Sequence, residues 1–182
     1  MFFANLLQIF VIFFPAFIAN AVPVVAKNIP YIQQFSRPIH ARLLWANKTV
    51  RGLITGVLGG MIAGLLLYIG RWFLVTLLPA YSEYYNLYSS WSVSVFLWWW
   101  LGLGALVGDM IKSFFKRRLG IKPGTMFQPW DGIDYMVGAI AFMLPFYFAS
   151  IGGSLFLLII WPILSLITNT IAYHIGWKEC WY

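Results

Sequence analysis

The longest stretch without Asp, Glu, Lys or Arg runs from Tyr135 to Trp177 and covers 43 residues. As a helix it would extend about 64 Å at ~1.5 Å per residue, which is twice the ~30 Å hydrocarbon thickness of a bilayer. We therefore expect it to cross a membrane twice. The Ser150–Ser154 segment, with its paired glycines and flanking serines, predicts the turn between the two crossings.

Three earlier stretches are also long and apolar enough to form membrane helices. They cover residues 1–26, residues 52–70 with a continuation past Arg71 to Leu78, and residues 84–108. The first lacks the basic start and small-residue cleavage pattern of a signal peptide, so we expect it to be retained. With 62% hydrophobic and 9% charged residues, the chain has too few charges to cover a soluble surface. The sequence thus predicts an all-α, polytopic integral membrane protein with five transmembrane helices in one domain, residues 1–182.

Basic side chains concentrate in two segments between the predicted spans. Residues 27–51 hold Lys27, Arg37, Arg42, Lys48 and Arg51, and residues 112–134 hold Lys112, Lys116, Arg117, Arg118 and Lys122. Basic loops are retained on the cytoplasmic side of a membrane. We therefore predict that both segments are cytoplasmic loops, that the N-terminus lies outside and that the C-terminus is cytoplasmic.

Three of the five acidic residues lie within or beside the second basic segment, namely Asp109, Asp131 and Asp134. Residues three, four and seven positions apart share one face of a helix, which groups Asp109 with Lys112, Ser113 and Lys116 and also pairs Asp131 with Asp134. Two helix ends can therefore direct carboxylates at one point. The residues alone leave two interpretations open: a Mg²⁺ site, because Mg²⁺ takes hard oxygen ligands, or ion pairs with neighbouring Lys and Arg.

Two clusters of hydrogen-bond donors accompany these carboxylates. The polar run Asn47-Lys48-Thr49-Val50-Arg51-Gly52 stands where a span begins, and Lys116-Arg117-Arg118 follows the end of another. A basic run after a span can serve topology alone. Both clusters on the same membrane face as the carboxylates favour a site for a metal-bound nucleotide polyphosphate.

Glycine recurs every four residues in the second span, at Gly52, Gly56, Gly60 and Gly64. Small residues at this spacing let another helix approach closely. The pattern predicts helix packing, either within the chain or in a homodimer.

The segment from Gly108 to Gly124, followed by Asp131-Gly132-Ile133-Asp134, resembles the cytosolic signature of the CDP-archaeol synthase family, the archaeal relatives of CDP-diacylglycerol synthases. The Asn47–Gly52 run is similar to the second motif of that family. The bacterial and eukaryotic branch has additional N-terminal spans and a Lys-Asp pair with a Pro-Gly-His-Gly-Gly stretch, whereas here Pro123 follows Lys122. The resemblance therefore favours the archaeal ether lipid over phosphatidate, the substrate of the alternative CDP-diacylglycerol synthase activity.

The resemblance implies a cytidylyltransferase that joins CTP to 2,3-bis-O-(geranylgeranyl)glycerol 1-phosphate, with Mg²⁺ as cofactor and the active site on the cytoplasmic side of the cell membrane. It implies catalytic roles for Asp109, Asp131, Asp134, Lys112 and Lys116, with the three aspartates as metal ligands. It implies that nucleotide contacts come from Asn47, Lys48, Thr49, Arg51, Ser113, Lys116 and Arg117. The expected partners are CTP, the prenylated lipid phosphate and the bilayer, and no nucleic acid.

Two other membrane-protein functions compete with this interpretation. CDP-alcohol phosphotransferases need an Asp-Gly-x-x-Ala-Arg motif, and the Asp131-Gly132-Ile133-Asp134 run continues instead with Tyr135. A small ion transporter would be expected to place charges near the middle of the bilayer, whereas the third, fourth and fifth predicted spans carry none there.

Overall fold

The structure is a computed structural model, and it describes residues 2–44, 48–71, 73, 76, 86–121, 125, 127 and 130–177. In order, its elements are α1 (Phe2–Ala26), the 3-10 helix η1 (Pro30–Phe35), α2 (Ala41–Leu44), α3 (Val50–Ile69), α6 (Trp91–Arg118), α7 (Trp130–Met143) and α8 (Ile151–His174). Extended pairing within these ranges is confined to one isolated bridge, between Pro38 and Thr49. The prediction of an all-α fold is confirmed for this part of the chain.

Four of the helices are long and apolar enough to cross a membrane. The qualifying segments are Asn5–Ala26, Val50–Ile69, Trp91–Arg118 and Ile151–His174. The 14-residue α7 extends only about 21 Å, which is short of the ~30 Å hydrocarbon core. A polytopic helical membrane protein is thus supported, while the fifth crossing and the orientation stay predictions.

The predicted turn at residues 150–154 is wrong in its position. Helix α7 already ends at Met143, and Ser150 is the N-cap residue of α8. The Ser150 side chain accepts a hydrogen bond from the backbone N–H of Gly153 at 3.1 Å, which satisfies a donor that the first helical turn leaves free. The serine and glycines therefore begin a helix, and the connection lies before them.

The second basic segment, residues 112–134, was predicted as a loop, but both of its ends are helical. Helix α6 continues from the apolar span through Lys112 to Arg118, and Asp131 and Asp134 lie in the first turns of α7. The charged side chains thus have fixed positions on two helices, as their helical spacing predicted, although residues 112–134 as a whole were assigned to a loop.

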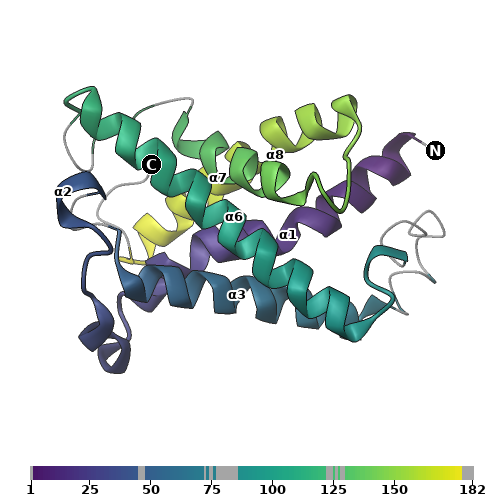
Figure 1. Cartoon of the computed structure of the whole chain (residues 1–182), viewed down its shortest axis with the longest axis horizontal. Helices are drawn as coiled ribbons and strands as arrows, with labels where there is room; N and C mark the ends of the chain where they lie inside the picture. Colours follow the sequence, from purple (N-terminus) through teal and green to yellow (C-terminus); the bar gives the residue numbers. More distant parts are fainter. Residues whose placement is uncertain are drawn as a thin grey trace.

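The helix ends that carry most of the charged side chains lie together at one end of the bundle. In Figure 1 the C-terminal ends of α1, α6 and α8 and the N-terminal ends of α3 and α7 all lie toward the left. Helix α1 is central and contacts α3, α6, α7 and α8. Its Phe10 and Phe17 rings stack on Trp161 of α8, with centroids 4.4 and 4.8 Å apart.

The glycine repeat of α3 is used for packing inside the chain. A side chain at Gly60 would place its Cβ 3.0 Å from the carbonyl oxygen of Pro15, and one at Gly56 would meet the carbonyl oxygen of Ala19. Both neighbours belong to α1. The repeat therefore explains how α1 and α3 approach, and it no longer supports a homodimer, which stays a prediction.

A second set of glycines brings α7 against α6. A Cβ at Gly108 would lie 3.0 Å from the Cα atom of Gly138 and would also meet the carbonyl oxygen of Asp134. Backbone-to-backbone contact here is what carries the carboxylates of α7 to those of α6.

Substituting Gly108 with valine should therefore force α6 and α7 apart. We expect Gly108→Val to destabilise the folded protein by about 1–3 kcal/mol or more, because the opposing atoms are backbone and cannot rotate away. Thermal unfolding in detergent, followed by size-exclusion chromatography, measures this.

Gly152→Ala is the matched control, since a Cβ at this helical glycine meets no atom within 4 Å. It should be neutral or slightly stabilising. Equal thermal unfolding temperatures for Gly108→Val and Gly152→Ala would contradict the close approach of α6 and α7.

Candidate functional site

Three carboxylates surround the ammonium group of Lys112. Its Nζ lies 3.3 Å from Oδ1 of Asp109, 3.0 Å from Oδ1 of Asp131 and 3.0 Å from Oδ2 of Asp134. Asp109 and Lys112 are one turn apart on α6, and the other two carboxylates lie one turn apart on α7. The structure therefore brings together all three aspartates that the sequence singled out.

Two further lysines complete the cluster. Lys48 pairs with Oδ2 of Asp109, and Lys116 lies 3.2 Å from Oδ2 of Asp131. Three ammonium groups thus balance three carboxylates, an arrangement that lowers the cost of holding charge at the edge of a membrane. In the structure, the carboxylates make the ion pairs that the sequence left as one of its two interpretations.

Asp134 is the most buried of the three acids. Its side chain is 5% exposed, against 18% for Asp109 and 28% for Asp131. Within the described residues, Lys112 supplies its only ion pair, through Oδ2 at 3.0 Å. An ionised carboxylate has about four lone-pair sites, so one ammonium group leaves it able to accept a further cation.

Lys48 lies just before the N-cap residue of α3, and the start of this helix places it beside the cluster. Thr49 caps the helix, its hydroxyl oxygen accepting from the backbone N–H of Gly52 at 3.1 Å. The preceding chain is held by two backbone hydrogen bonds, from Ile39 N–H to Lys48 O at 2.8 Å and from Val50 N–H to Arg37 O at 2.9 Å. Thr49 thus has a structural role as the helix cap, and its contact with a nucleotide stays a prediction.

Lys116 and Arg117 hold the chain that follows α6. The buried Lys116 ammonium donates to the carbonyl oxygen of Thr125, and Asp131 accepts from the backbone N–H of Phe127 at 2.5 Å. Arg117 donates to the carbonyl oxygen of Ile121. These contacts hold Asp131 beside Phe127 and tie Lys116 and Arg117 to Thr125 and Ile121.

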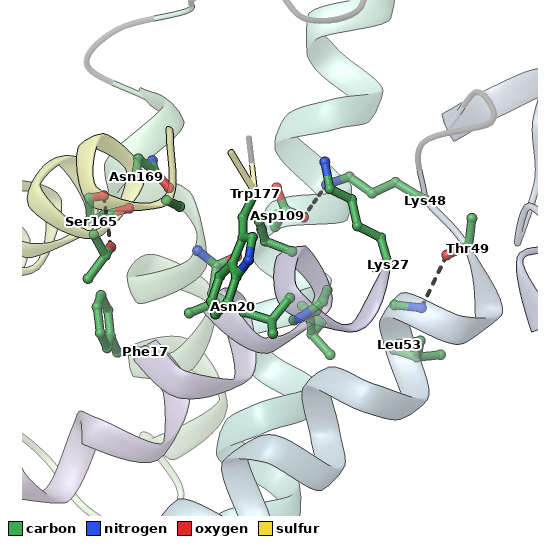
Figure 2. A pocket seen from close by; sticks show the side chains of 18 of the residues that line it. Phe17, Asn20, Lys27, Lys48, Thr49, Leu53, Asp109, Ser165, Asn169 and Trp177 are labelled. Atoms are coloured by element: carbon green, nitrogen blue, oxygen red, sulfur yellow. Dashed lines mark hydrogen bonds and ion pairs between the residues drawn. The ribbon is translucent and has the colours of Figure 1, made fainter. Parts of the chain in front are cut away.

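A cavity of about 580 Å³ opens beside the cluster (Figure 2). Its charged wall carries Lys27, Lys48, Arg51, Asp109 and Asp131. Polar side chains of α1 and α8 also line it: Asn20, Ser165, Thr168 and Asn169. The cavity therefore joins a charged region to a neutral polar one at the end of the membrane helices.

The predicted site residues divide into two groups. Lys48, Thr49, Arg51, Asp109 and Asp131 line the cavity. The remaining described ones do not line it, and they are Lys112, Ser113, Lys116, Arg117 and Asp134. Asn47 lies outside the described residues.

Sequence reasoning missed several of the lining residues. Lys27 was counted only as a topology charge, and the polar side chains of α1 and α8 were absorbed into apolar spans. The signal was present, because Ser165, Thr168 and Asn169 recur at intervals of three and four residues and so share one face of a helix.

The carboxylate oxygens of Asp109, Asp131 and Asp134 are of the chemical type that binds Mg²⁺. No group of three or more His, Cys, Asp or Glu side chains in the described ranges is arranged as a ready metal cage, since Lys112 occupies the centre of the carboxylates. Mg²⁺ does not require such a cage, because it is bound through one or two carboxylates together with substrate phosphates and water. The buried carboxylate of Asp134, with Lys112 as its one ion-pair partner among the described residues, is a suitable ligand.

Comparison with known proteins places the chain in a family. A family model described as CarS-like, CDP-archaeol synthase, matches residues 2–182. The chain belongs to the CDP-archaeol synthase family. Among its relatives, the CDP-archaeol synthase of Thermococcus gammatolerans is 36% identical over 91% of this chain and 90% of the relative. That of Methanosarcina mazei is 38% identical over 76% and 81% of the two chains.

A solved structure shares the fold of this member of the CDP-archaeol synthase family. It is described as an intramembrane enzyme for archaeal membrane lipids biosynthesis, and it aligns with a TM-score of 0.68 at 29% identity. The alignment covers 88% of this chain and 91% of the other. The likeness therefore extends over nearly all of both proteins.

The central ion pair can be tested by a double-mutant cycle. Lys112→Met should destabilise the protein by roughly 3–5 kcal/mol, because it leaves the buried Asp134 carboxylate without the one counter-ion it has among the described residues. The double variant Lys112→Met with Asp134→Asn should recover part of that loss, as measured by thermal unfolding in detergent with a chelator present.

Arg118→Met serves as the control, because Arg118 is exposed at the end of the same helix. It should change stability by less than about 0.5 kcal/mol. A Lys112→Met variant as stable as Arg118→Met would show that the three carboxylates do not depend on Lys112.

Proposed function

We propose that the chain is a membrane-bound cytidylyltransferase that transfers CMP from CTP to 2,3-bis-O-(geranylgeranyl)glycerol 1-phosphate, yielding the CDP-activated lipid and pyrophosphate. The observation that carries this proposal is the cavity in which Lys48 and Arg51 face Asp109 and Asp131 at the end of the membrane helices. Family membership supplies the substrate class, since the relatives are named CDP-archaeol synthases.

The reaction needs charge neutralisation more than a protein nucleophile. An oxygen of the lipid phosphate attacks the α-phosphorus of CTP, and the bond from that phosphorus to the oxygen bridging the β-phosphate breaks as pyrophosphate leaves. Both reactants are anions, so their approach depends on fixed positive charge. Positioning and electrostatics therefore supply the rate.

The lysines and arginine of the cavity are placed to provide that charge. Lys27, Lys48 and Arg51 line it and can bind the triphosphate and the incoming lipid phosphate. Arg51 is steadied by a hydrogen bond from its Nη1 to the hydroxyl of Ser36 at 2.7 Å. Lys112 and Lys116 do not line the cavity, and their role is to position Asp109, Asp131 and Asp134 through ion pairs.

Asp109, Asp131 and Asp134 would hold the divalent cation. When bound, Mg²⁺ supplies charge neutralisation of the phosphates and of the leaving pyrophosphate. Asp134 contributes a buried carboxylate that Lys112 alone ion-pairs within the described residues, and Asp109 and Asp131 line the cavity where the phosphates would enter.

The lipid chains have an apolar groove available to them. A second cavity of about 620 Å³ lies between α1 and α3, lined mainly by aliphatic and aromatic side chains such as Phe14, Ile18, Leu58 and Ile62. We assign it to a prenyl chain. Its lining residues Leu58 and Ile62 are exposed on α3, so a lipid chain can enter from the membrane while its phosphate reaches CTP.

The proposal includes a membrane orientation. We place the basic end of the bundle in the cytoplasm, where CTP is found, and the N-terminus outside. Helix α7 and the residues up to Ser150 together form the fifth crossing, since α7 starts at the basic end and α8 returns to it (Figure 1).

Asp134→Asn should abolish turnover while leaving the protein folded. The amide keeps the shape of the carboxylate and removes its charge, so cation binding fails and the rate should fall by at least about a hundredfold. Pyrophosphate release and labelled CDP-lipid formation are measured with purified protein, CTP, Mg²⁺ and the lipid phosphate.

Arg71→Gln is the control for loss of a charge, because Arg71 follows the opposite end of α3. It should keep its rate within about twofold of the unsubstituted protein, because Arg71 contacts Tyr68 and does not line the charged cavity. Near-normal turnover by Asp134→Asn would remove this carboxylate from the reaction.

Chelation tests the metal separately from any substitution. Activity should disappear in excess chelator and return on addition of Mg²⁺ or Mn²⁺, because both cations prefer oxygen ligands. Full activity in chelator would refute metal dependence, and absence of activity under every condition would refute the proposed function itself.

A further inference from the structure

Helix α8 turns its polar face toward the cavity. Ser165, Thr168 and Asn169 are half-buried and line the cavity, whereas Leu166 and Ile167 between them are exposed on the outside of the helix. Polar groups in a membrane helix must find partners, because lipid offers none. The inward polar face of α8 therefore points to a ligand or to water in the cavity.

Two carboxamides in this region, those of Asn20 and Asn169, have no hydrogen-bond partner among the residues that the structure describes. Thr168 donates to the carbonyl oxygen of Ser165 at 3.0 Å, and Thr170 donates to that of Leu166 at 2.8 Å. Across the described ranges, neither Asn20 nor Asn169 makes a hydrogen bond with another residue. The threonines are thus satisfied by their own helix, while the asparagines keep both donor and acceptor groups available.

The cavity is divided into a charged end and a neutral end. Figure 2 shows Asn169 on the side of the view opposite Lys48 and Lys27, with Asn20 and Trp177 between them. A nucleoside triphosphate has the same division, since its phosphates are anionic and its base is neutral and planar. Phosphates held at Lys48 would direct the base toward α8.

We propose that Asn20 and Asn169 bind the pyrimidine base of the nucleotide and that the Trp177 indole provides a stacking surface for it. This inference rests on the proposed function, and it adds which residues select the base. Cytosine offers an amino donor at N4 beside acceptors at N3 and O2, so one carboxamide oxygen can accept from N4 while the other carboxamide donates to the ring. Uracil reverses the donor and acceptor on that edge.

Nucleotide selectivity is the measurement that tests the assignment. We expect Asn169→Ala and Asn20→Ala each to lower kcat/KM for CTP by about 10- to 100-fold and to reduce the preference for CTP over UTP, because base contacts are lost. The KM for the lipid phosphate should stay within about twofold. Trp177→Ala should weaken CTP binding, and Trp177→Phe should largely restore it, since a ring can still stack.

Thr170→Ala is the matched control, because Thr170 is a polar residue of the same helix that does not line the cavity. It should leave nucleotide selectivity unchanged. CTP and UTP binding to the full-length protein in detergent, measured by calorimetry without lipid, gives a second readout that does not depend on turnover. Asn20→Ser or Asn169→Ser replaces the alanine variant at the same position if that variant fails to fold.

The outcomes separate this inference from the proposed function. An unsubstituted protein that converts CTP, together with asparagine variants of unchanged CTP preference, overturns the base assignment alone. A raised KM for lipid with unchanged nucleotide selectivity overturns it as well and assigns the two carboxamides to the lipid head. An unsubstituted protein that neither binds nor converts CTP overturns both.

Discussion

The site depends on the position of the Lys112 ammonium among three carboxylates. Charges at the edge of a bilayer are costly unless they are paired, and here Asp109, Asp131 and Asp134 converge within 3.3 Å of one nitrogen. Lys48 and Lys116 neutralise what remains of the negative charge. This balance allows three carboxylates to lie close together at a largely buried position, which is the arrangement on which the proposed cation site depends.

Helix packing makes that convergence geometrically possible. Gly108 and Gly138 remove the side chains that would hold α6 and α7 apart, so their backbones touch at the level of Asp134. The glycines of α3 do the same against α1, which sets the N-terminal end of α3, and hence Lys48, beside Asp109. Residues without chemistry of their own therefore determine where the reactive groups lie.

The fold was predictable where hydrophobicity alone decides it. The four long apolar helices follow from runs of uncharged residues, and the gathering of acidic and basic side chains follows from helical spacing. The connection between α7 and α8 was misplaced, because serine and glycine favour turns but also begin helices. Ser150 shows the second use through its hydrogen bond with Gly153. Lys116 was similarly predicted to bind phosphate. The structure shows it buried, with its ammonium donating to the carbonyl oxygen of Thr125.

The sequence by itself determined that most of the chain lies in a membrane, that it is helical and which charged groups it carries. Each of these follows from local composition and spacing. Only the tertiary structure decided which groups share a site. It paired Lys48 with Asp109 across 61 positions and turned Asn20 and Asn169 toward one cavity. Such meetings depend on the approach of helices distant in the chain, and no local pattern records that approach.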